Sequence, residues 1–121
     1  MGFKIKSCEK HNIAIISIEG EVDMFTSPNF RDEMLPYFKK EVKAIVVDLK
    51  GVSFMDSSGI ATLVEGLQWS KKKDGRQFIL TGPGPNVKNA LALTKLDNIF
   101  TIKDDKDEVL HHLSKIEGKM I

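Results

Sequence analysis

The sequence predicts an α/β fold, because strand-like and helix-like segments alternate along the chain. Residues 44–49 form a nearly continuous apolar run of strand length, as is typical of a strand buried on both faces. After this run, apolar side chains recur at helical spacing and predict an amphipathic helix; they are Ile60, Leu63, Val64 and Leu67. Strand–helix–strand order favours right-handed crossovers and parallel pairing in the middle of the sheet.

The first half of the chain contains two further strands and a helix. The strands are predicted near residues 3–8, where apolar and polar side chains alternate, and near residues 13–19, which are mostly apolar. A helix is predicted near residues 27–39, because Ser27 followed by a proline is a typical N-cap and first-turn pair. Pro36 has no backbone donor, so a kink or an early end of this helix is expected close to it.

The second half of the chain continues the alternation. The remaining strands are predicted near residues 77–81 and 99–102, and the remaining helices near residues 57–72, 85–95 and 105–117. Gly75 marks a helix stop, and Pro85 suits the first position of a helix. Asp105 with Glu108 resembles a capping box ahead of the last helix.

Length and charge narrow the classes of function. The 121 residues fit a single domain, residues 1–121, with one core. A net charge of +1, from 18 basic and 17 acidic residues, gives no field that favours nucleic acid as a direct partner. The lone basic cluster, Lys71-Lys72-Lys73, is interpreted as a solvated helix C-terminus rather than an anion site. No stretch approaches the length of a membrane span, so we expect no membrane insertion.

Cysteine content bears on the compartment. Cys8 is the only cysteine, so the chain cannot form an intrachain disulfide. This is consistent with a reducing environment, and the N-terminus lacks the unbroken apolar core of a signal peptide. The predicted location is therefore the cytoplasm.

Enzymatic chemistry finds little support in the sequence. A serine hydrolase would need a nucleophile elbow, but Met55 occupies the first glycine position of that motif around Ser57. The histidines His11, His111 and His112 are interpreted as surface residues rather than as a catalytic base. One cysteine and scattered histidines make no recognisable metal-ligand set. The turn at residues 81–86 resembles a nucleotide-binding loop, but it contains two prolines, which have no N–H to donate to a phosphate. We therefore expect neither a metal ion nor another cofactor.

The most informative segment is Asp56-Ser57-Ser58-Gly59, which lies where a helix should begin. Asp56 or Ser57 can serve as N-cap, but a cap needs only one side chain, and three consecutive candidates stand here. Gly59 costs about 1 kcal/mol relative to alanine inside a helix, so we expect that its bare backbone allows the close approach of another molecule. A phosphate on a serine here would lie at the positive end of the helix dipole. The segment thus predicts a modifiable switch.

This segment resembles the signature of STAS domains, in particular of the bacterial anti-sigma factor antagonists. A second match is Gly20-Glu21-Val22-Asp23, which directly follows an apolar strand and is similar to the Gly-Glu-Leu-Asp turn of the family. The order and spacing of the elements agree over nearly the whole chain. One departure is Gly59-Ile60-Ala61, where many members have Gly-Leu-Gly, so the choice of partner is expected to differ.

The resemblance implies a STAS fold, with a mixed sheet of four to five strands and about four helices largely on one face. It also implies a non-enzymatic regulator that binds an anti-sigma factor, itself a serine/threonine kinase, and frees a sigma factor. That kinase would phosphorylate Ser57, the serine directly after the aspartate, and a metal-dependent serine phosphatase would reset the switch. The implied contact residues are Gly20, Glu21, Asp23, Asp56, Ser57, Ser58 and Gly59.

Two further interpretations stay open at this point. Glu21 and Asp23 either pair with arginines of the partner or are simply solvated turn residues. Trp69 lies about 180° around the helix from the apolar stripe, so either a neighbouring element or a binding partner covers it. The alternative to a switch is a STAS subunit with a structural role in a larger signalling or membrane-associated assembly.

Overall fold

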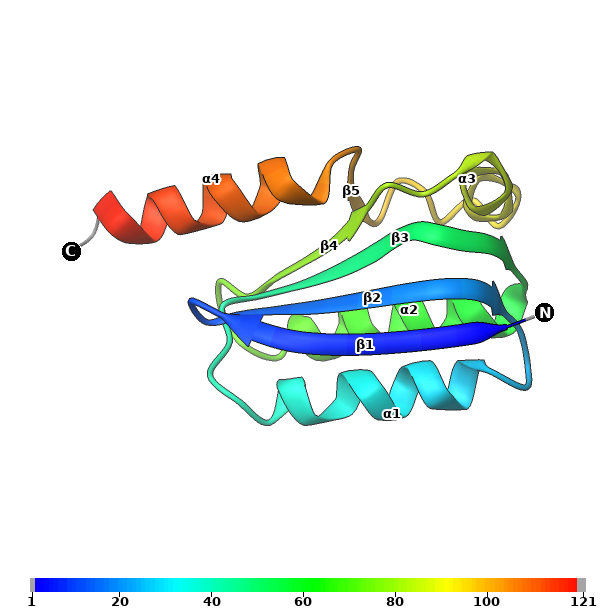
Figure 1. Cartoon of the computed structure of the whole chain (residues 1–121), viewed down its shortest axis with the longest axis horizontal. Coiled ribbons are helices and arrows are strands. Elements are labelled where there is room, and N and C mark those ends of the chain that lie inside the picture. The colour runs from blue at the N-terminus through cyan, green and yellow to red at the C-terminus, as the bar shows by residue number, and fades with distance from the viewer. Residues whose placement is uncertain (1, 120–121) are drawn as a thin grey trace.

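The structure is a computed structural model that describes residues 2–119, with side chains described through Ser114. The strands are β1 (Phe3–Lys10), β2 (Ile13–Val22), β3 (Ala44–Met55), β4 (Gln77–Thr81) and β5 (Thr101–Lys103). The helices are α1 (Ser27–Phe38), α2 (Ser57–Ser70), α3 (Pro85–Leu93) and α4 (Lys106–Lys119). Figure 1 shows how these elements are arranged.

The five strands form one mixed sheet in the order β1-β2-β3-β4-β5. β1 is antiparallel to β2, and every other neighbouring pair is parallel. The tight turn between β1 and β2 places His11 and Asn12 at positive φ, as hairpin turns that match the twist of the strands require. The predicted mixed sheet with parallel central strands is confirmed.

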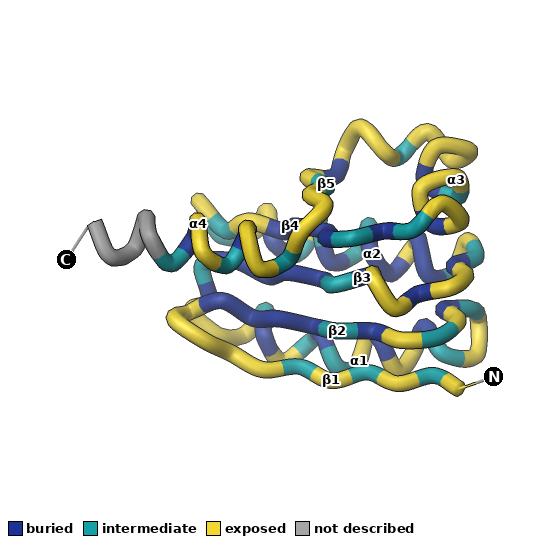
Figure 2. Tube along the Cα trace, turned by 45° about the horizontal axis from the view of Figure 1, so that its top comes forward, coloured by how far each residue is buried: buried dark blue, intermediate teal, exposed yellow. Residues whose placement is uncertain are grey.

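Helices cover both faces of the sheet, but unequally. The main core lies under α1, α2 and α3, and includes Phe30, Leu63 and Leu91. A smaller core lies on the opposite face, where Val109 and Leu113 of α4 pack on β2, β3 and β4. In Figure 2 the buried residues are concentrated in the strands between these layers. Helices therefore lie largely on one face, as predicted, and α4 is the exception.

Two strand ends differ from the sequence prediction, and the difference shapes the site. β3 continues to Met55 instead of ending near residue 49, because β2 offers it a pairing partner as far as Val22. The segment Gly20–Val22, predicted as a turn, is therefore the end of β2, and the register shifts between Gly20 and Glu21. The extension brings the start of α2 beside the end of β2.

The inward face of α2 also differs from the prediction. The residues of α2 that are buried are Gly59, Ile60, Thr62, Leu63, Gly66 and Ser70, whereas Val64 and Leu67 are only half-buried. A Cβ on Gly66 would lie 2.7 Å from Cζ of Phe78, so the missing side chain lets the helix approach the sheet closely. Periodicity alone cannot identify this small-residue face, because glycine and serine carry no apolar signal.

Candidate functional site

The candidate site lies at the edge of the sheet where β2 and β3 end, on the right in Figure 1. Because these strands are parallel, the loop from β2 to α1 and the start of α2 meet at this edge. The backbone N–H of Asp56 donates to the carbonyl of Val22, with the nitrogen 3.0 Å from the oxygen. The structure thus brings the two predicted motifs together.

Asp56 is the N-cap of α2, in an extended backbone conformation. Its Oδ1 accepts hydrogen bonds from the backbone N–H of Ser58 at 2.9 Å and of Gly59 at 3.2 Å, and from the Ser58 hydroxyl at 2.6 Å. Burial by itself would raise the pKa of this carboxyl, but hydrogen bonds from Ser58 and Gly59, together with the nearby backbone N–H of Met24, outweigh burial and lower the pKa. Asp56 is therefore ionised when it caps α2.

The two adjacent serines have different surroundings. Ser57 is the first residue of α2 and is exposed, and its hydroxyl makes no hydrogen bond to any residue that the structure describes. Ser58 is half-buried, and its hydroxyl is held by Asp56. The carboxylate therefore leaves only the Ser57 hydroxyl fully accessible to another molecule.

Gly59 faces inward, which corrects the interpretation of its bare backbone. It is buried, and an added Cβ would lie 2.6 Å from Cγ of Met55 and 2.8 Å from Cγ1 of Val22. These contacts explain the glycine by packing within the chain, where the sequence had suggested space for a partner. Its N–H is also occupied by Asp56.

The loop after β2 is shaped by Asp23. Its Oδ1 accepts hydrogen bonds from the N–H of Phe25 at 2.9 Å and of Thr26 at 3.0 Å. The Thr26 hydroxyl in turn donates to the carbonyl of Glu21 at 2.9 Å, and Thr26, not Ser27, is the N-cap of α1. Asp23 is thus engaged in its own turn. The Glu21 side chain is exposed and has no polar partner among the described residues, so it is free for an external contact.

Three exposed apolar side chains flank this edge and were missed by the sequence analysis. Met24 is 67% exposed, Phe25 is 79% exposed, and Phe54, whose Cα lies opposite Glu21 across β2 and β3, is 46% exposed. Large apolar side chains that gather on a surface indicate an interaction site. The signal in the sequence that could have identified them is the pair Met24-Phe25, two apolar residues in a short loop that is otherwise polar. We call Glu21, Met24, Phe25, Phe54 and Ser57 the Ser57 surface.

Trp69 does not belong to the Ser57 surface. It lies in the last turn of α2, about 18 Å along the helix axis from Ser57 at 1.5 Å per residue. Its ring packs edge-on against Phe38, with 5.1 Å between the ring centroids, and the Arg31 guanidinium lies 5.6 Å from its centroid. A neighbouring element, α1, therefore covers part of Trp69, and contact of its remaining surface with a partner stays a prediction.

The described residues contain neither a metal-binding cluster nor a membrane-spanning helix. Within residues 2–119, no three His, Cys, Asp or Glu side chains are grouped so that they could hold a metal ion. In the same part of the chain, no helix is long and apolar enough to cross a membrane. His11 lies in the β1–β2 turn at the opposite end of the sheet from Ser57, and His111 and His112 lie on α4, which packs on the face of the sheet opposite to α2.

Comparison with known proteins places the chain. A family model described as the STAS domain matches residues 4–109. The chain belongs to the STAS domain family. The resemblance seen in the two sequence motifs is thereby confirmed, and so is the fold that it implied.

Relatives of this STAS protein are anti-sigma factor antagonists. The anti-sigma-B factor antagonist of Listeria monocytogenes is 27% identical over 109 residues, which cover 90% of this chain and 94% of the relative. An anti-sigma factor antagonist from Mycobacterium paratuberculosis has a similar structure, with a TM-score of 0.82, 24% identity and coverage of 92% of this chain and 93% of that one. The Bacillus cell fate determinant SpoIIAA in its phosphorylated form matches with a TM-score of 0.72, 18% identity and coverage of 93% and 99%.

Proposed function

We propose that this STAS protein is an anti-sigma factor antagonist that acts in the cytoplasm by binding, not by turnover, with Ser57 as its switch. The observation that carries the proposal is the exposed, unpaired hydroxyl of Ser57 at the first position of α2. Its relatives carry the same functional name, and one of them has been solved in a phosphorylated form. The unphosphorylated protein binds an anti-sigma factor that is also a serine/threonine kinase, which releases its sigma factor.

The Ser57 surface supplies the contacts for this binding. Met24 and Phe25 offer apolar area that a partner can bury, and aromatic side chains often anchor interfaces. Glu21 offers an unpaired carboxylate to an arginine or lysine of the partner. Ser57 lies beside these groups, so its hydroxyl reaches the partner's active site while the surface is occupied.

Phosphorylation acts locally by adding charge. A phosphate on Ser57 brings about −1.5 to −2 charges at pH 7. The backbone N–H groups of Ser58 and Gly59, which would otherwise bind it, are already bonded to Asp56. A phosphate on Ser57 would therefore add negative charge next to the carboxylate of Asp56, and this charge opposes a closely packed interface. The fold need not change for the partner to be released.

The remaining chemistry belongs to the partners. ATP and its metal ion would be held by the kinase, and a metal-dependent serine phosphatase would remove the phosphate. Asp56 is committed to the cap by three hydrogen bonds, and the segments that form the Ser57 surface contain no histidine that could act as a base. A hydrolytic role for Ser57 therefore has no support in its surroundings.

Capture of partners from the lysate of the host tests the proposal. Wild type and Ser57→Ala are expected to retain an ATP-binding kinase that Ser57→Asp loses, and wild type should carry phosphate on Ser57. Ser58→Ala is the matched control and should retain the same kinase as wild type. Binding that ignores all three substitutions, with no phosphate on Ser57, would instead support a structural STAS subunit.

A further inference from the structure

A second surface lies at the opposite end of α2 from Ser57. Here the C-terminal ends of α1 and α2 enclose an open groove of about 370 Å³. Leu35, Phe38 and Trp69 form its apolar floor. We call this the basic groove, because most of its remaining lining residues are lysine or arginine.

The cations of the basic groove exceed its anions. Its rim carries Lys39, Lys40, Lys72 and Lys73, and Glu41 is the acidic residue among the lining side chains. Lys73 forms an ion pair with Glu41, and Lys40 forms one with Glu9 at 3.5 Å. Lys39 and Lys72 are exposed and have no ion-pair partner within residues 2–119. Two lysines of the rim are therefore available to an external carboxylate.

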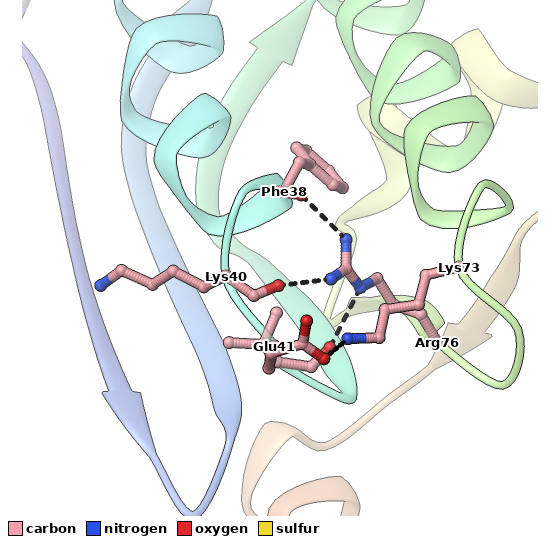
Figure 3. A network of polar contacts seen from close by, with 6 residues as sticks. Phe38, Lys40, Glu41, Lys73 and Arg76 are labelled. Atoms are coloured by element: carbon pink, nitrogen blue, oxygen red, sulfur yellow. Dashed lines mark hydrogen bonds and ion pairs between the residues drawn. The ribbon is translucent and has the colours of Figure 1, made fainter.

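Arg76 lines the basic groove and donates hydrogen bonds to the connection between α1 and β3, as Figure 3 shows. Its Nε donates to the carbonyl of Val42 at 3.0 Å and its Nη2 to that of Lys40 at 2.6 Å, while Nη1 lies 3.5 Å from the carbonyl of Phe38. These bonds hold the connection between α1 and β3 against the end of α2. A lining segment held in this way lowers the entropic cost of binding.

We propose that the basic groove binds an acidic segment of a second protein, through an apolar side chain on its floor and carboxylates at Lys39 and Lys72. A peptide with an apolar side chain between carboxylates is complementary to this groove, because its apolar floor is bordered by cations that have no ion-pair partner among the described residues. The floor lies about 18 Å from Ser57 along the axis of α2. The Ser57 surface and the basic groove lie at opposite ends of α2. The protein can therefore hold a second partner while the first is bound.

Contacts of the aromatic floor favour a peptide over nucleic acid. Binding of single strands relies on aromatic faces on which bases stack. In the basic groove the chain's own guanidinium groups cover part of these rings, with Arg31 at 5.6 Å from the Trp69 centroid and Arg76 at 5.9 Å from the Phe38 centroid, so less ring face is left on which a base could stack. The net charge of +1 also gives no broad field for a polyanion or an anionic membrane.

Lys72 and Lys73, interpreted from the sequence as part of a solvated helix end, line the basic groove in the structure. The sequence could not show that Lys39 and Arg76, from other segments, border the same groove as Lys72. Nor could it show that Trp69 and Phe38 lie between them. The basic cluster acquires a binding role only through this arrangement.

Trp69 provides the assay, because it is the only tryptophan in the chain. The probe is a short synthetic peptide in which Glu and Asp residues flank one leucine, titrated into the full chain at low ionic strength. We expect a saturable change in Trp69 emission. The combined variant Lys39→Glu with Lys72→Glu should weaken binding by about tenfold or more, since like charges then face the peptide.

A charge-matched variant is the control. Lys4→Glu with Lys6→Glu changes the net charge equally on the exposed side of β1 and should leave the affinity within about twofold. Three results would overturn the proposal: no saturable emission change, equal losses in both double variants, or tighter binding of a single-stranded oligonucleotide or anionic vesicles at the same ionic strength. None of them bears on Ser57, so the two proposals can fail independently.

Discussion

The carboxylate of Asp56 accepts the Ser58 hydroxyl at 2.6 Å, and this contact distinguishes two serines that the sequence presents side by side. Ser58 becomes part of the helix cap, while Ser57 keeps an exposed hydroxyl. The same carboxylate also binds the N–H groups of Ser58 and Gly59. One side chain therefore caps the start of α2 and distinguishes the accessible serine from its neighbour.

The two serines should respond differently to substitution. Ser57→Ala is expected to abolish phosphate incorporation by the partner kinase and leave the free energy of unfolding nearly unchanged, because its hydroxyl has no partner in the described chain. Ser58→Ala should still be phosphorylated but should lose about 1 kcal/mol of stability with its hydrogen bond. Mass spectrometry and denaturant unfolding measure the two effects. Phosphate retained by Ser57→Ala would refute the assignment.

Asp56 should contribute to stability chiefly as an N-cap. Asp56→Ala removes the acceptor of three hydrogen bonds and is expected to lower the free energy of unfolding by about 1–2 kcal/mol. Asp56→Asn keeps an acceptor oxygen and serves as the matched variant, with a smaller loss. Denaturant unfolding at neutral pH gives both values, and equal losses in both variants would argue against the cap.

Acid should reduce the contribution of Asp56. Its pKa is lowered in the folded state from the ordinary value of 3.8, so the unfolded chain binds this proton more tightly. The stabilisation is then fully present above the unfolded pKa and is lost as pH falls through the folded pKa. The difference in unfolding free energy between wild type and Asp56→Asn should therefore shrink below pH 3.8. A difference that is constant with pH would contradict the lowered pKa.

Gly59 should be required by packing. Gly59→Ala places a Cβ 2.6 Å from Cγ of Met55, and we expect a loss of about 1–3 kcal/mol despite the better helix propensity of alanine. Ala61→Gly, at an exposed position of the same helix, is the control and should cost about 1 kcal/mol through propensity alone. If Gly59→Ala folds with full stability but fails to bind its partner, the original interpretation of the bare backbone would be restored.

Met24 and Phe25 should matter for binding and not for folding. Their combined replacement by alanine is expected to weaken binding of the anti-sigma factor by tenfold or more, because exposed anchors of an interface typically contribute over about 1 kcal/mol each. Leu93→Ala removes a side chain that is 85% exposed at the end of α3 and is the control. Calorimetric titration measures both. Equal effects would show that the Ser57 surface is wrongly defined.

The sequence was sufficient for the order of elements, because long apolar runs and capping residues are local signals. The apolar run 44–49 is such a signal, and a strand does begin at Ala44; Gly75, predicted as a helix stop, instead lies in the turn after α2, which ends at Ser70 with Lys71 as its C-cap. The extension of β3 to Met55 escaped prediction, since its last residues are ordered by pairing with β2 and not by their own pattern. Gly20 was assigned to a turn for the same reason.

Prediction of the site was uneven for a related physical reason. Asp56 was identified because capping is a local property. The buried position of Gly59 depends on Val22 and Met55, and the cover over Trp69 depends on Phe38 of another helix. Such contacts between distant segments leave no trace in spacing. The exposed loop residues Met24 and Phe25 were overlooked because apolar residues usually point to the core.

The most direct test of the central claim is the affinity of the purified protein for its anti-sigma factor before and after phosphorylation of Ser57. The account predicts tight binding of the unphosphorylated protein, a loss of at least about a hundredfold on phosphorylation, and recovery when a phosphatase removes the phosphate. Ser57→Ala should stay in the tight-binding state throughout. Equal affinity of the phosphorylated and unphosphorylated forms would contradict the proposed switch.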